Sequence, residues 1–438
     1  MALVIVLLGI VLLIFLIGYF KLNTFITFII VSVTIGLALG MEISTVTNAI
    51  KTGIGNTLGF LVIILGFGAM LGKIVADSGA AQRITTSLID AFGEKYIQWA
   101  LVLTGFIVGI PMFYSVGFVI LVPLVFSVAA RTKLPLLYVG LPMLASLSVT
   151  HGYLPPHPAP SALAETFGAD LGTTLLYGII VAIPAIILGG PVFSRTLKKY
   201  NPKPLEAFFN PKVLKEDEMP SLGASVFSAL LPVILLAVTA GFNFVVDTDS
   251  VIGKVLSFLG DPFIAMLISV VVAIYILGIR RNKTMNEVSE TLLEGVKGIA
   301  MIMLIIGGAG ALKQILIESG VSQIIADNLI TINASPLILA WGISAVIRVC
   351  VGSATVAGLT SAGIVFPLIA QTGADPSLMV LATGAGSLMF SHLNDSGFWL
   401  FKEYFNLSIK DTLKTWSIME TIVSVTGIIG VLILSNFV

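Results

Sequence analysis

All three histidines of the sequence lie in two short segments that combine breaking and polar residues. His151 and His157 belong to LSVTHGYLPPHPAPSA, whereas LMFSHLNDSGFW contains His392, Asn394, Asp395 and Ser396. Imidazole and carboxyl groups can bind and release protons, and amides and hydroxyls can hydrogen-bond a polar solute. These two segments are therefore the first candidates for a functional site.

Two further segments offer hydroxyl groups beside small residues. GIPMFYSVG contains Tyr114 and Ser115, and CVGSATVAG contains Ser353 and Thr355. Helices that begin there would present unpaired N–H groups and the positive end of a dipole, which suit a carboxylate, and the hydroxyls would suit a polyol. Arg348, one turn before the second segment, could instead brace the backbone.

Each of these segments also has a purely structural interpretation. The histidines could hydrogen-bond backbone that a helix break exposes, and Asp395 could cap the helix that begins at GFWLFKEYF. The small residues could simply permit close helix packing. Both interpretations remain open at this point.

The composition places most of the chain in lipid. Its 438 residues are 57% hydrophobic and 11% charged, against roughly 25% charged in soluble domains. Basic and acidic residues balance at 23 each, which argues against a nucleic-acid partner. The single cysteine, Cys350, excludes an intrachain disulfide, and we expect no metal and no cofactor.

The apolar residues form twelve candidate segments of about 20 residues each, with one long polar connection at 195–220. The segments are 2–20, 22–40, 54–76, 97–127, 134–150, 173–193, 223–246, 262–279, 296–317, 335–371, 376–391 and 415–437. A shift of 241 positions aligns GFGAMLGKIVADSGAAQRI with GGAGALKQILIESGVSQII and places His151 on His392 without a gap. We therefore predict two related membrane domains, 1–194 and 221–438, joined by a cytoplasmic linker at 195–220.

The distribution of positive charge predicts how these two halves are oriented. Segments 97–127 and 335–371 are interrupted in the middle, and each arm of the first spans only about 21 Å of a hydrocarbon core of about 30 Å. If both are re-entrant hairpins, 19 lysines and arginines lie inside against three outside, whereas twelve full crossings give 13 against nine. The expected fold is all-α, with two inverted repeats of five crossings, one hairpin and one broken helix each. This architecture is typical of secondary transporters.

A transporter of this kind binds its substrate where broken helices meet near the membrane midplane. The predicted substrate-binding residues are Tyr114, Ser115, His151, Ser353, Thr355, His392, Asn394 and Ser396. The predicted proton-carrying residues are His151, His157, His392 and Asp395, because ionisable groups inside a membrane are usually functional.

The segments HGYLPPHPAP, VGSATVAG and SHLNDSGFWLFKEYFNLS resemble the gluconate permease family of gluconate:proton symporters, over nearly the whole chain. This resemblance implies import of a sugar acid with protons through the bacterial cytoplasmic (inner) membrane, by a protein embedded in lipid and commonly dimeric. In other members the first tip reads like Phe-Tyr-Glu-Val-Gly, whereas this chain has Ser115 in place of the glutamate. The proton stoichiometry is therefore left open.

Three other functions remain to be weighed. The same family includes permeases for D-serine and other small hydroxy acids. Ser353 and His392 could be the nucleophile and the base of an intramembrane hydrolase, the minimum set for nucleophilic catalysis. A channel would differ by lacking saturable exchange of substrate.

Overall fold

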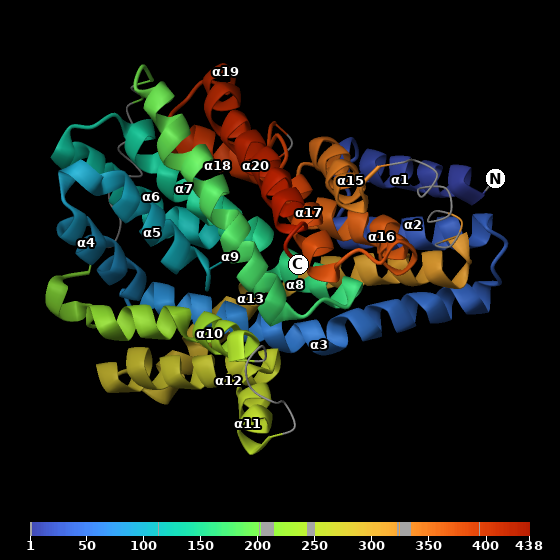
Figure 1. Cartoon of the computed structure of the whole chain (residues 1–438), viewed down its shortest axis with the longest axis horizontal. Coiled ribbons are helices and arrows are strands. Elements are labelled where there is room, and N and C mark those ends of the chain that lie inside the picture. Colours follow the sequence, from blue (N-terminus) through green and yellow to red (C-terminus); the bar gives the residue numbers. More distant parts are fainter. Residues whose placement is uncertain are drawn as a thin grey trace.

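The computed structural model describes residues 2–112, 114–200, 202, 214–242, 250–321, 324, 334–393 and 395–438. Every regular element within these ranges is a helix (Figure 1). The first half contains α1 (Ala2–Gly18), α2 (Thr24–Ala38), α3 (Ile43–Asp77), α4 (Ala80–Phe92), α5 (Ile97–Gly109), α6 (Tyr114–Thr132), α7 (Leu136–Tyr153), α8 (Pro158–Phe167) and α9 (Leu171–Ile187). The second half contains α10 (Leu222–Phe242), α11 (Val251–Gly260), α12 (Pro262–Ala273), α13 (Met285–Glu318), α15 (Pro336–Val351), α16 (Ala354–Thr372), α17 (Pro376–Ser387), α18 (Ser396–Tyr404), α19 (Ile409–Thr412) and α20 (Ile418–Leu434).

Short turns of other helical types extend several of these helices. The 3₁₀ turns are η1 (Glu94–Tyr96), η3 (Arg195–Leu197), η5 (Glu216–Glu218) and η7 (Ile279–Arg281). The π-helical turns are η2 (Leu188–Val192), η6 (Ile274–Gly278) and η8 (Leu413–Ser417). Among the described residues, five helical stretches are long and apolar enough to cross a membrane, and α3, which bends by 44°, is a sixth.

The helices α3 and α13 run side by side along the long axis of the molecule (Figure 1). They pack backbone against backbone, because a Cβ atom at Gly53 would lie 2.4 Å from the carbonyl oxygen of Gly310. At the other end, a Cβ atom at Gly295 would lie 2.6 Å from the carbonyl oxygen of Ala69. Low residue numbers of one helix therefore meet high numbers of the other, and the pair is antiparallel.

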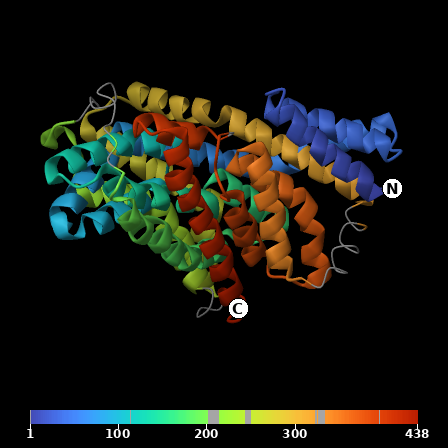
Figure 2. The same ribbon diagram turned by 90° about the horizontal axis from the view of Figure 1, so that it is seen from above.

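The remaining helices pack along this central pair. Helices α4–α7 lie toward one end, α1, α2, α15 and α16 lie toward the other, and α20 crosses steeply between them (Figure 2). Helix α20 contacts both α9 and α17, so it joins the two halves of the chain.

The long segments 97–127 and 335–371 are each divided into two helices, as the sequence predicts. Helix α5 ends at Gly109 and α6 begins at Tyr114, and Gly352 separates α15 from α16. Gly352 has φ +81°, a conformation that glycine adopts without steric penalty. The predictions for 54–76 and 296–317 were too short, because α3 and α13 have 35 and 34 residues.

The two predicted helix breaks also lie where breaking residues occur. Helix α7 ends at Tyr153, the chain passes through a cis peptide bond between Pro155 and Pro156, and α8 begins at Pro158. Pro158 occupies the first helical position, where a missing N–H has no consequence. Helix α17 ends at Ser387, and α18 continues the chain from Ser396. Each break is therefore followed by a further helix, α8 after the first and α18 after the second.

Helix α4 holds the described end of the polar connection. The Arg83 side chain donates hydrogen bonds to the carbonyl oxygens of Pro220 (2.9 Å) and Glu216 (2.7 Å), and its guanidinium also pairs with the Glu216 carboxylate. The Gln82 amide exchanges two hydrogen bonds with the backbone of Leu214. The connection between the halves is thus tied to the first half before α10 begins.

Candidate binding site

A cavity of about 240 Å³ lies where the broken helices and the hairpin breaks come together. Its walls come from α6, α7, α13, α15, α16, α18, η8, α20, the end of α17 and the segments before α16 and α18. Its polar lining residues are Tyr114, Ser148, His151, Arg348, Ser353, Thr355, Asp395, Trp416 and Glu420. On the α13 side the wall is apolar and consists of Ile302 and Ile305.

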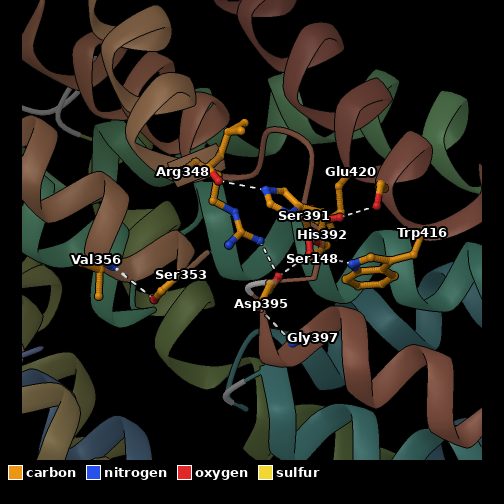
Figure 3. A network of polar contacts seen from close by, with 12 residues as sticks. Ser148, Arg348, Ser353, Val356, Ser391, His392, Asp395, Gly397, Trp416 and Glu420 are labelled. Atoms are coloured by element: carbon orange, nitrogen blue, oxygen red, sulfur yellow. Dashed lines mark hydrogen bonds and ion pairs between the residues drawn. The ribbon is translucent and has the colours of Figure 1, made fainter. Parts of the chain in front are cut away.

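The strongest electrostatic contact at this cavity joins Arg348 to Asp395 (Figure 3). The Arg348 Nη2 atom lies 2.5 Å from Asp395 Oδ2, and the two side chains are 4% and 13% exposed. The Arg348 Nε and Nη1 groups have no hydrogen-bond partner among the described residues. A buried guanidinium with unused donors is suited to bind a carboxylate.

Asp395 also organises the backbone of the second break. Its Oδ1 accepts a hydrogen bond of 2.9 Å from Gly397 N, so the capping interpretation of this residue is confirmed. Its Oδ2 accepts a hydrogen bond from the hydroxyl of Ser391. Trp416 Nε1 donates to the same Ser391 oxygen at 2.7 Å. Asp395 thus has structural contacts in addition to its place at the cavity wall.

The hairpin break before α16 presents hydroxyls and backbone donors to the cavity. Ser353 is the N-cap of α16, and its Oγ accepts a long hydrogen bond of 3.4 Å from Val356 N. Thr355 lies in the first turn of that helix and also lines the cavity. On the opposite hairpin, Tyr114 begins α6, and its buried hydroxyl has no hydrogen-bond partner among the described residues.

The three histidines have different environments. His157 Nε2 lies 2.8 Å from the Gly109 carbonyl oxygen, and His392 Nε2 lies 2.8 Å from the Val349 carbonyl oxygen. Because a carbonyl oxygen only accepts, Nε2 carries a proton in both rings. Neither of these histidines lines the cavity. They bind the last turns of α5 and α15, where helix carbonyls lack partners.

His151 is the histidine that lines the cavity. It lies in the last turn of α7, its ring centroid is 6.2 Å from that of Tyr114, and it is 5.4 Å from that of His157. Its Nδ1 atom has no hydrogen-bond partner among the described residues. The 241-residue shift aligns His151 with His392 in sequence. In the structure, however, His392 makes the same kind of contact as His157, a hydrogen bond to a carbonyl near the end of a hairpin helix.

Glu420, which was not among the residues predicted from the sequence, lies on α20 and is only 1% exposed. Ser148 Oγ donates a hydrogen bond of 2.5 Å to Glu420 Oε1, and Oε2 has no partner in the described part of the chain. A signal was available, because this is the single acidic residue of the apolar segment 415–437.

The structure places the ten predicted site residues as follows. Five line the cavity: Tyr114, His151, Ser353, Thr355 and Asp395. Ser115 lies in the first turn of α6 and Ser396 is the first residue of α18, but their side chains are outside the description. His157 and His392 are described but do not line the cavity. Asn394 lies outside the described residues altogether.

A polar cavity at helix breaks, surrounded by long apolar helices, is the arrangement of a multi-pass membrane permease for a small polar solute. The chain belongs to the GntP family of permeases, whose family model matches residues 1–438. It is 53% identical over 435 residues to the high-affinity gluconate transporter of Escherichia coli (strain K12), covering 99% of each chain. It is 50% identical over 432 residues to the Gnt-II system L-idonate transporter of the same strain, covering 99% of this chain and 98% of that one. The gluconate permease of Bacillus subtilis (strain 168) is 46% identical over 445 residues, with 99% of each chain covered.

Two solved structures have the same fold at low sequence identity. The YdaH transporter of Alcanivorax borkumensis has a TM-score of 0.69 and 16% identity, covering 94% of this chain and 98% of that one. MtrF of Neisseria gonorrhoeae has a TM-score of 0.69 and 14% identity, covering 95% and 96%. The resemblance to gluconate permeases is thus confirmed. The chain is a permease and not an enzyme, so the hydrolase alternative involving Ser353 and His392 is excluded.

Proposed function

We propose that this permease imports gluconate, or a closely related sugar acid, together with protons through the bacterial inner membrane. Relatives named for gluconate and for L-idonate support a six-carbon sugar acid. A permease for D-serine or another small hydroxy acid is the alternative.

The observation that carries this proposal is the chemistry of the cavity wall. The unused Arg348 donors would bind the substrate carboxylate, and the hydroxyls of Ser353 and Thr355 would bind its own hydroxyls. The N-terminus of α16, whose first-turn N–H groups lack partners within the helix, would add to the attraction for an anion. Asn394 and Ser396 remain predicted hydroxyl-binding residues beside Asp395.

Transport would proceed by alternating access between two inverted halves. The repeat register aligns α3 with α13, and these two helices pack antiparallel. Two equivalent helices in opposite directions are what inverted repeats require. The hairpin-bearing parts would then move against the α3–α13 pair while the substrate stays in the cavity.

The membrane potential makes a coupled cation useful. Moving one negative charge inward against a negative-inside potential costs about 2.3 kcal/mol for each 100 mV. One proton that travels with the sugar acid removes this cost, and a second would make uptake electrogenic.

Uptake of labelled gluconate into proteoliposomes tests this proposal. Gluconate should enter saturably, unlabelled L-idonate should compete better than D-serine, and an inward proton gradient should drive accumulation. Better competition by D-serine would establish the alternative substrate. Persistent gluconate exchange without any gluconate-dependent proton uptake would refute symport, and unsaturable flux would indicate a channel.

A further inference from the structure

Among the described residues that line the cavity, Glu420 is the buried carboxyl without a cationic partner. Arg348 is the cation of the cavity wall, and its described ion pair is with Asp395. The described contact of Glu420 is the hydrogen bond from Ser148, which occupies Oε1 (Figure 3). Its Oε2 is buried and has no hydrogen-bond partner among the described residues, and Glu420 is one of the residues that line the cavity.

The surroundings of Glu420 favour its neutral form when the cavity is closed. An ionised carboxylate is costly to bury unless a cation or several donors compensate it. The other ionisable groups around it are Arg348, Asp395, Tyr114 and His151 at the cavity and Tyr153 beside it. Arg348 and Asp395 balance one another, so no net positive charge remains to stabilise an ionised Glu420.

An anionic substrate strengthens this preference. A carboxylate bound at Arg348 adds a negative charge to the cavity, and it would repel a second one on Glu420. Substrate binding therefore favours a proton on Glu420, and by reciprocity a proton on Glu420 favours substrate binding. Such mutual reinforcement is what symport of an anion and a proton requires.

We propose that Glu420 carries the co-transported proton, and that Ser148 positions its carboxyl group. The proposal rests on proton-coupled import of a sugar acid, as proposed above. The proton binds Oε2 when the cavity faces outward, remains while the occupied cavity turns inward, and returns to water after the substrate leaves. Among the histidines, His157 and His392 do not line the cavity, and Asp395 is held by Arg348. These observations favour Glu420 over those three candidates.

Reconstituted full-length protein tests the proposal by separating exchange from coupling. A gradient of about one pH unit can concentrate the substrate about tenfold for each coupled proton. Wild type and Glu290→Gln, which changes an exposed carboxyl on α13, should show this accumulation. Glu420→Gln should still exchange gluconate by counterflow, but its accumulation ratio should fall toward one. Glu420→Asp should retain coupling, and Ser148→Ala should retain it with a shifted pH profile of uptake.

The outcomes distinguish this proposal from the one on which it rests. If Glu420→Gln accumulates gluconate as wild type does, Glu420 is not the carrier, while symport itself stands. If wild type shows no gluconate-dependent proton uptake, symport fails and the role of Glu420 fails with it. Loss of counterflow in both Glu420→Gln and Glu420→Asp, at normal protein levels, would make Glu420 a packing residue and overturn the proposal.

Discussion

The Arg348–Asp395 pair allows substrate binding to be separated from structural support by a double-mutant cycle. Changing Arg348→Gln removes the cation but leaves the buried Asp395 carboxylate, whose side chain is 13% exposed. Removing one partner of a buried ion pair costs about 3–5 kcal/mol of stability. Asp395→Asn should be similarly harmful, although asparagine preserves the cap of α18. The double variant buries no unpaired charge, and we expect it to regain most of the lost stability.

Substrate affinity should behave differently in the same cycle. The Arg348 Nε and Nη1 groups are free to bind a carboxylate, and they are absent from both Arg348→Gln and the double variant. A hydrogen bond to a charged group is worth about 1.5–3 kcal/mol. With each 1.4 kcal/mol equal to a factor of ten, loss of one such bond weakens gluconate binding roughly 10- to 100-fold. The double variant should therefore be stable but should bind gluconate weakly.

Thermal unfolding in detergent would measure stability, and the KM of gluconate counterflow in proteoliposomes would report affinity. Addition of gluconate should raise the unfolding temperature of wild type and have little effect on the double variant. The reasoning is refuted if the double variant regains both stability and wild-type KM. In that case the role of Arg348 would be only to neutralise the Asp395 carboxylate, and the substrate carboxylate would bind elsewhere.

Three further variants test the packing, the histidines and the linker. Gly53→Ala should lower the free energy of unfolding by about 1–3 kcal/mol, because its Cβ would meet the backbone of α13, and thermal unfolding should show no comparable loss for Gly55→Ala, whose Cβ has open space. His157→Gln should keep proton-driven accumulation, since the amide can still donate to the end of α5; exchange without accumulation would instead assign the proton to this residue. Arg83→Ala should speed cleavage after Glu216 by a glutamate-specific protease in membrane vesicles, and an unchanged rate would show that the linker is held by other contacts.

The helix breaks were predictable from sequence because their causes are local. Proline at positions 155 and 156 cannot continue a helix, and Gly352 adopts a positive φ that other residues avoid. The capping role of Asp395 follows from the same local chemistry.

The contacts that build the cavity could not be predicted, because they join distant parts of the chain. The Ser148 hydroxyl and the Glu420 carboxyl are 272 positions apart, and Arg348 and Asp395 are 47 apart. The sequence identifies such groups as costly inside a membrane, but pairing depends on which helices pack together. For that reason Glu420 was missed although its position in an apolar segment was visible.

The two halves show how a gap-free sequence register can mislead about side-chain roles. The register equates His151 with His392, but α7 continues to Tyr153, whereas α17 ends at Ser387, the register equivalent of Ser146. What the two breaks share is a histidine a few residues beyond the helix end. His157 lies four residues after α7 and His392 lies five residues after α17, and each donates to the last turn of its hairpin helix.

The similar contacts of His157 and His392 separate two kinds of ionisable group, those that bind the backbone of the helix breaks and those that line the cavity. One histidine in each half binds a carbonyl near the end of a hairpin helix, as expected if the two halves are repeats of one framework. Arg348, Asp395 and Glu420 make contacts for which the first half has no described equivalent. All three line the same cavity. If the framework is duplicated as proposed, its charged groups still come from the second half and form a single site. We therefore expect the asymmetry of that site, and not the symmetry of the repeat, to determine which anion binds and where a coupled proton would be held.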